Sequence, residues 1–320
     1  MSSNKCGKTK SAVTAKGDYK KGKTHFNARE FKAAYKCFNI GAAVGHVPSI
    51  HFLGLIAYGG LCGPKSYISA AHYFQIGANA EYTYSQASLA TLYMNGRGVH
   101  YDPSKALSLF KASLKHGRSE VNRVTLWRIG GIYKRGDGVD QAYDTAMKYF
   151  NMSMLDGYPA AAFSIGDLYL RGMGVTVDYE AASRYFAVAA RGGHAEAQFK
   201  LGLMFIRGVG ENVDVRRGFK LMRMAACNGE SRAFLQTGLM YKNGQGVERN
   251  DEEAFRWFRK SARKRYSVGM YHLATMHHTG RGTPMDLQKA SYYYSLSEQL
   301  GYSPSKLMLA ALSMLDLNTE

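Results

Sequence analysis

Three histidines near the C-terminal end of the chain are the first residues whose types and spacing could support chemistry. His272, His277 and His278 could supply imidazole ligands to a metal ion. A metal site needs further ligands, and no carboxylate or cysteine stands at a spacing that completes one. His277 also takes a position that is tyrosine in equivalent segments of the chain, which predicts a packed side chain. We therefore expect neither a metal site nor a cofactor.

Nucleophiles, acid–base pairs and phosphate-binding loops are predicted to be absent as well. Six Gly-x-Gly pairs occur, but none extends to Gly-x-Gly-x-x-Gly after a strand or continues into Gly-Lys-Ser/Thr, so a tight turn explains them all. Cys37 and Cys227 lie among apolar neighbours, as small hydrophobic residues do. Asp156 and Asp167 are isolated, whereas acid–base catalysis needs groups that converge. The sequence predicts no catalytic residue and no small-molecule substrate.

The glycine pairs recur at a fixed period, which indicates an internal repeat. The first spacing is 40 residues and the later ones are 36, with pairs beginning at Gly96, Gly136, Gly172, Gly208, Gly244 and Gly280. Within one unit, Ala161, Ile165 and Tyr169 stand at i, i+4 and i+8, and Ala182 and Phe186 repeat the pattern further along. This spacing is typical of amphipathic helices, so each unit is predicted to be two helices of about a dozen residues.

Turn and cap residues define the ends of these helices. The Gly-x-Gly turn ends the first helix of each unit, because glycine accepts the left-handed conformation of a tight C-cap. Aspartates that could cap the second helix follow at Asp102, Asp178 and Asp251. Glycines also recur inside the first helix, where each costs about 1 kcal/mol in helix propensity. Their recurrence predicts close contact between helices, at Gly130, Gly166, Gly202 and Gly238.

One pair of helices cannot bury its apolar face alone, so neighbouring pairs must stack into a solenoid. We predict an all-α fold of about eight antiparallel helix pairs, at 17–45, 46–81, 82–117, 118–157, 158–193, 194–229, 230–265 and 266–301. Residues 302–320 are expected to form a capping helix and tail, and residues 1–16 a disordered basic arm. The four extra residues of the fourth unit are expected in a loop between Gly117 and Leu126.

These motifs resemble the Sel1-like repeat (SLR), a relative of the tetratricopeptide repeat. Residues 161–175 read Ala-x-x-x-Ile-Gly-x-x-Tyr-x-x-Gly-x-Gly-Val and are followed by Asp178, Ala182 and Phe186. The resemblance covers about residues 46–301, and the first pair is closer to a plain tetratricopeptide repeat. It implies a right-handed α-α superhelical solenoid that acts as an adaptor without catalysis. Such proteins occur in membrane-associated degradation complexes, in activation of fungal cell-wall synthases and among host-interaction factors of intracellular bacteria.

Positive charge is concentrated in two segments of a chain whose net charge is +18. Residues 1–36 and residues 200–265 each carry +8. Equivalent second helices place basic residues in register, at Lys148, Arg184, Lys220 and Arg256, with Arg223, Arg259 and Arg263 alongside. Another series precedes three consecutive turns, at Arg135, Arg171 and Arg207. These residues form either a solvated face or a docking strip for acidic protein segments or nucleic-acid phosphates.

The leading hypothesis is a non-enzymatic scaffold that binds partner proteins. By analogy with related solenoids, the first helices would line a concave groove that exposes Phe163, Asp167, Leu203, Leu239 and Lys242. The alternative is an RNA-associated or ribonucleoprotein-complex subunit that uses the basic patches. No apolar run approaches the roughly 18 residues that span a bilayer. The first seventeen residues lack the apolar core of a secretory signal, so we expect an intracellular, cytoplasmic protein, with organellar import as the alternative.

Overall fold

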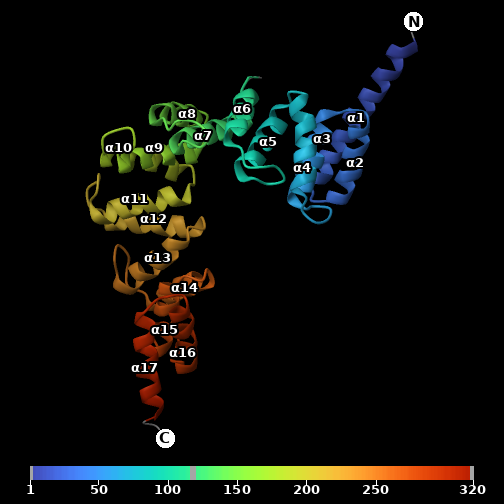
Figure 1. Cartoon of the computed structure of the whole chain (residues 1–320). Helices are drawn as coiled ribbons and strands as arrows, with labels where there is room; N and C mark the ends of the chain where they lie inside the picture. Colours follow the sequence, from blue (N-terminus) through green and yellow to red (C-terminus); the bar gives the residue numbers. More distant parts are fainter. Residues whose placement is uncertain (1–2, 116–119, 318–320) are drawn as a thin grey trace. The chain divides into compact units, whose positions relative to one another are not determined.

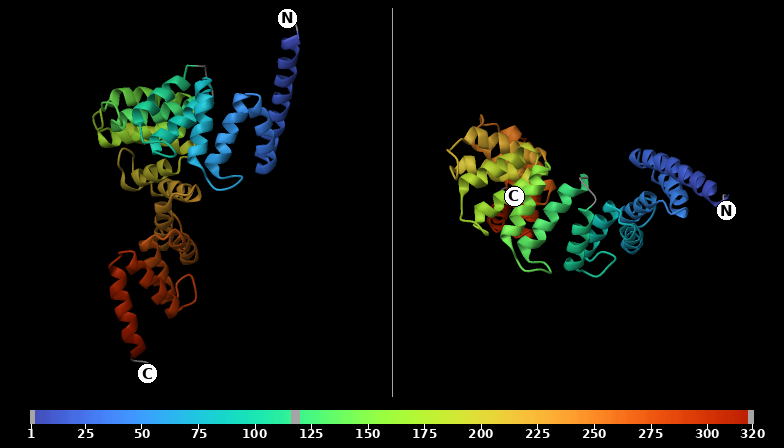
Figure 2. Two further views of the ribbon diagram at one scale, coloured as in Figure 1. Left: turned by 45° about the vertical axis from the view of Figure 1, so that its right-hand side comes forward. Right: turned by 90° about the horizontal axis from the view of Figure 1, so that it is seen from above.

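The computed structural model describes residues 3–115 and 120–317, and the regular structure of this part is entirely helical (Figure 1). Residues 3–115 and 120–317 form seventeen helices and no strand. They fall into two compact units, Met1–Gly157 and Tyr158–Glu320. Within each unit, consecutive helices lie side by side in chain order (Figure 2). The predicted all-α fold of stacked antiparallel helix pairs is therefore confirmed.

The first unit holds four helix pairs. Most of its helices have 13 residues, and each packs on the next one along the chain. The helices are α1 (Ser3–Asn27), α2 (Phe31–Ala43), α3 (Val47–Gly59), α4 (Tyr67–Asn79), α5 (Thr83–Asn95), α6 (Pro103–Ser113), α7 (Glu120–Arg135) and α8 (Tyr143–Leu155).

The second unit holds four further pairs and the capping helix. A core between pairs is built from Met222, Phe234 and Trp257, contributed by three consecutive helices. The helices are α9 (Pro159–Arg171), α10 (Tyr179–Arg191), α11 (Ala195–Arg207), α12 (Val215–Cys227), α13 (Ser231–Asn243), α14 (Asp251–Arg263), α15 (Ser267–Thr279), α16 (Leu287–Gln299) and α17 (Pro304–Leu317).

Glycines inside the first helices of several pairs allow the second helix to approach closely, as predicted. A Cβ atom on Gly166 would lie 2.8 Å from the Phe186 ring, and one on Gly238 would lie 2.7 Å from the Phe258 ring. Both distances are shorter than side chains tolerate, so only glycine fits these positions. The large aromatic residue of the second helix is thereby buried against the backbone of the first.

Three local predictions differ from the structure. Residues 3–16 continue α1 instead of forming a disordered arm, and the segment before Asn27 contains no proline that would break the helix. The fourth unit's extra residues lengthen α7, which has 16 residues and begins at Glu120, while residues 116–119 lie outside the described part. The cap of α14 is Asn250, whose side chain accepts from the backbone N–H of Glu253, and Asp251 instead pairs with Arg249.

In the part of the chain that the structure describes, no helix is both long and apolar enough to cross a membrane.

Candidate functional site

Five exposed cations line the polar faces of α12 and α14, and we name them the basic ridge: Lys220, Arg223, Arg256, Arg259 and Arg263. Spacings of three and four residues put the members on each helix on one face. The opposite faces are buried through Met222 and Phe258, which fixes the orientation of both helices. The amphipathic pattern of the sequence was sufficient to predict that these five residues are exposed.

Most of the positive charge of the basic ridge is available to a partner. The Arg256 guanidinium donates to Glu253 at 2.5 Å, and the Arg259 guanidinium lies 5.9 Å from the Phe255 ring centre. Among the described residues, no carboxylate forms an ion pair with Lys220, Arg223 or Arg263. Helix α12 carries four basic residues and no acidic one, so its outer face is positive from Arg216 to Arg223.

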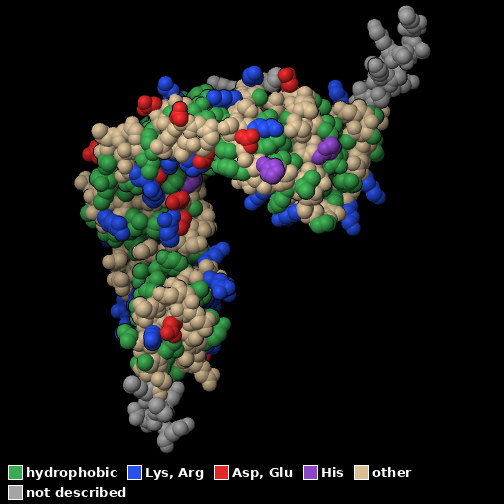
Figure 3. Space-filling view, in the orientation of Figure 1, with side chains coloured by type: hydrophobic (Ala, Val, Ile, Leu, Met, Phe, Trp, Pro, Cys, Tyr) green, Lys and Arg blue, Asp and Glu red, His purple; other side chains and the backbone are tan. Residues whose placement is uncertain are grey.

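Basic side chains are visible on both units in the space-filling view, with acidic side chains among them (Figure 3). The arginines that precede the turns show how such neighbours reduce the charge. Arg135 pairs with Asp137 at 2.5 Å in the first unit, and Arg171 pairs with Asp167 at 3.0 Å in the second. Arg207 is exposed and makes no ion pair with a described residue. This series is therefore weaker than the basic ridge as an anion-binding surface.

Asp167 is not an exposed groove residue, contrary to the prediction. Only 6% of it is exposed, and its carboxylate accepts from Lys200 at 2.8 Å and from Arg171 at 3.0 Å. Lys200 belongs to α11, the first helix of the next pair, which covers this part of α9. An ion pair between neighbouring first helices explains the burial of a carboxylate, because buried charges require partners.

Phe163 is half-buried because the N-terminal half of α11 also packs against it. Its ring stacks on the His194 ring with centroids 4.6 Å apart, and Lys200 Nζ lies 5.2 Å from its centre. Leu203 and Leu239 are also half-buried and pack against the hydrophobic core. These residues stabilise the stacking of pairs, and their predicted exposure is wrong.

The C-terminal histidines are packed against aromatic rings. His272 stacks on Phe258 with centroids 5.0 Å apart, and burial lowers its pKa to about 4. His277 is 7% exposed, and burial lowers its pKa as well, so its predicted packing is confirmed. No group of three metal-ligating side chains is found among the described residues.

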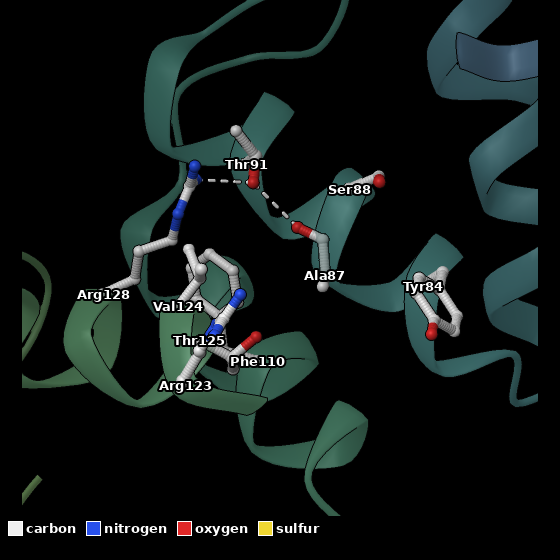
Figure 4. Close-up of a pocket in the computed structure, with 9 residues that line it drawn as sticks. All are labelled: Tyr84, Ala87, Ser88, Thr91, Phe110, Arg123, Val124, Thr125 and Arg128. Carbon is white, nitrogen blue, oxygen red and sulfur yellow. Dashed lines mark hydrogen bonds between the residues drawn. The ribbon is translucent and has the colours of Figure 1, made fainter. Parts of the chain in front are cut away.

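A cavity of about 360 Å³ in the first unit was not predicted from the sequence (Figure 4). It opens between α5 and α7, and we name it the α5–α7 pocket. Arg128 Nη1 donates to Thr91 Oγ1 at 2.6 Å, and this hydroxyl donates to the Ala87 carbonyl at 2.8 Å. The lining residues are Tyr84, Ala87, Ser88, Thr91, Phe110, Arg123, Val124, Thr125 and Arg128.

Comparison with protein families agrees with the observed period. The Sel1 repeat matches seven consecutive segments, which together cover most of the chain: 47–82, 83–117, 125–157, 159–194, 195–230, 235–266 and 267–302. None of the curated proteins matches the chain.

Two solved structures share the fold at high coverage. The first is a protective antigen of uropathogenic Escherichia coli strains that displays an SLR fold, with 25% identity and a TM-score of 0.73. The match covers 96% of this chain but only 66% of the antigen. The second is a Sel1 repeat protein from Oxalobacter formigenes, with 22% identity, a TM-score of 0.73 and coverage of 95% of this chain and 87% of that one.

Proposed function

Because this chain belongs to the Sel1 repeat family, we propose that it is a non-enzymatic scaffold that binds partner proteins, with the basic ridge as a docking strip for acidic segments. Stacked repeats expose long surfaces while they bury their helices against one another. Such surfaces suit extended partners, since neighbouring repeats contribute contacts in series. Membership of the family supports protein binding in general, whereas the role of the basic ridge is our inference from its geometry.

The observation that carries this proposal is the accumulation of positive charge on α12, which has no acidic residue, and on the C-terminal half of α14, whose three acidic residues all lie in its first turn. Lys220, Arg223 and Arg263 lack an acidic partner among the described residues, so their field extends into solvent. Met224, four residues after Lys220, is 47% exposed and adds an apolar contact on the same helix face. Charge of one sign steers an oppositely charged partner and sets the register of binding, and a nearby apolar group adds affinity.

RNA is the alternative partner, and the net charge of +18 is the observation that favours it. Phosphate binding releases condensed counterions, so affinity would fall steeply with salt, with a slope of about −0.7 per phosphate neutralised on a single strand. Many of the 23 tyrosines pack on neighbouring rings of the chain, as Tyr133 does on Tyr149 and Tyr169 on Tyr185, which leaves fewer of them to stack on bases. We therefore place the protein partner first.

Affinity capture from native cells, followed by mass spectrometry, tests the proposal. The ridge variant combines Arg223→Glu, Arg256→Glu, Arg259→Glu and Arg263→Glu. The matched control makes the same change in net charge on the exposed face of α1, with Lys16→Glu, Lys20→Glu, Lys21→Glu and Lys23→Glu. We expect specific partners to be lost from the ridge variant and retained by the control.

Retention of the same partners by the ridge variant would contradict the docking role. Filter binding of labelled RNA across a salt series tests the alternative. RNA retained by the native chain and the control, but released by the ridge variant, would replace the protein partner with RNA.

A further inference from the structure

Aromatic or imidazole rings fill the space between neighbouring first helices at three junctions of the solenoid. In each, a residue just before one first helix, or before the capping helix α17, packs its ring on a residue of the first helix that precedes it in the chain. The ring centroids are 5.5, 4.6 and 5.2 Å apart in the pairs His51–Tyr82, Phe163–His194 and Tyr271–Tyr302. The two members always stand 31 residues apart, so they are equivalent positions of the repeat.

Both rings are missing at the junction of α5 and α7. The equivalent residues are Ala87 and Asn122, which stand 35 residues apart because of the four-residue insertion. Ala87 and Asn122 are buried and lie where the other junctions place rings. Neither side chain is large enough to replace a ring, and the α5–α7 pocket opens beside Ala87 at this junction (Figure 4).

The chemistry of the α5–α7 pocket is apolar at its base and positive at its rim. Ala87, Phe110 and Val124 supply apolar surface, and none of the nine lining residues is acidic. The Arg128 guanidinium lies 5.9 Å from the Phe110 ring centre and is held by its hydrogen bond to Thr91. Arg123 is exposed and forms no ion pair with a described carboxylate.

We propose that the α5–α7 pocket binds an aromatic side chain of a partner protein together with a neighbouring carboxylate of the same segment. The ring would take the place of the missing pair and stack near Phe110, while the carboxylate would meet the exposed Arg123. A volume of about 360 Å³ lies at the lower end of ligand pockets, which suits one side chain better than a nucleotide or a lipid. A bidentate arginine–carboxylate contact would fix the direction of the segment.

This inference rests on the proposed protein-binding function, but it concerns the other unit and none of the ridge residues. It can therefore fail while the docking role of the basic ridge holds, and the reverse is also true. The two proposals require different variants, so their outcomes can be separated.

Fluorescence anisotropy with a defined peptide tests the inference on the full chain. The probe is fluorescein-labelled Gly-Asp-Glu-Phe-Glu-Asp-Gly, and its reference is the same peptide with alanine in place of phenylalanine. We expect the native chain to bind the phenylalanine peptide about tenfold more tightly, as for a buried aromatic anchor. Equal affinity for the two peptides would overturn the proposal.

Two kinds of variant locate the binding to the pocket. Ala87→Phe restores a ring of the kind found at Phe163, and Ala87→Leu reproduces the residue at equivalent position 235 if the larger side chain prevents folding. Either is expected to abolish the preference for the phenylalanine peptide. Arg123→Gln is expected to weaken binding about fivefold, whereas Lys23→Gln, which removes an exposed charge from α1, should not. A preference that survives filling of the pocket would place the peptide elsewhere and overturn the proposal.

Discussion

A Cβ atom on Gly130 would lie 2.6 Å from Cε1 of Phe150, so the ring of α8 packs directly on the backbone of α7. The same relationship recurs along the chain and fixes how closely the two helices of a pair approach. The next residue, Gly131, faces a different environment, since its Cβ would meet only the mobile end of Arg135 at 3.3 Å. Of these two adjacent glycines, Gly130 therefore has no room for a side chain, whereas Gly131 does.

Gly130→Ala is expected to lower the free energy of unfolding by about 1–3 kcal/mol, because the methyl group overpacks the contact with Phe150. Gly131→Ala is the matched control and should leave stability unchanged or raise it by up to about 1 kcal/mol, through higher helix propensity. Urea denaturation followed by circular dichroism measures both. Equal effects of the two substitutions would show that the glycine is not required by the ring.

Asp167→Asn is expected to lower the free energy of unfolding by about 1–3 kcal/mol. The amide leaves Lys200 and Arg171 without their carboxylate, and Lys200 is largely buried. Asp140→Asn, at an exposed position in the first unit, should change stability by less than about 0.5 kcal/mol. Thermal denaturation compares the two variants. An unaltered melting temperature for Asp167→Asn would show that the ion pair does not stabilise the fold.

Stability of the first unit is expected to fall as the pH drops from about 6.5 to about 4. Burial lowers the pKa of His51 from 6.5 to about 4, so the unfolded chain takes up a proton in this range while the folded chain does not. The contribution of the buried, neutral His51 ring to stability is therefore fully present above pH 6.5 and is lost as the pH falls toward about 4.

His51→Phe should remove up to about 3 kcal/mol of this pH dependence, since a shift of one pKa unit corresponds to about 1.4 kcal/mol. Phenylalanine stands at the equivalent position 163, so the ring can be accommodated. Urea denaturation at several pH values compares the native chain with the variant. An identical loss of stability in acid would assign the effect to other groups.

Much of the fold could be predicted because each helix pair repeats the same local signals. The positions of Gly166 and Phe186 in the repeat were sufficient to predict both helices and their close approach. The cap of α14 was misplaced by one residue because an aspartate was sought at each cap. Asn250, not Asp251, caps α14, since position 250 lies 36 residues after the cap Asp214 and 36 before the cap Asp286, and an amide oxygen accepts the cap hydrogen bond as well.

The exposure or burial of a site residue could be predicted where it depends on one helix, but not where it depends on the packing of two helices. Arg223 and Arg263 are exposed because they stand opposite buried residues of their own helices. The burial of Asp167 depends on Lys200, 33 residues further along the chain, which no pattern within one unit indicates. The α5–α7 pocket did leave a signal, since Ala87 interrupts a column that includes His51 and Phe163.

The affinity of a purified partner for the native chain and for the ridge variant, measured at low and at high salt, tests the docking role of the basic ridge most directly. We predict that charge reversal at Arg223, Arg256, Arg259 and Arg263 weakens binding about tenfold or more at low salt and reduces its salt dependence. The control with four reversed lysines on α1 should bind as the native chain does. Equal affinities and equal salt dependence for the native chain and the ridge variant would contradict the account.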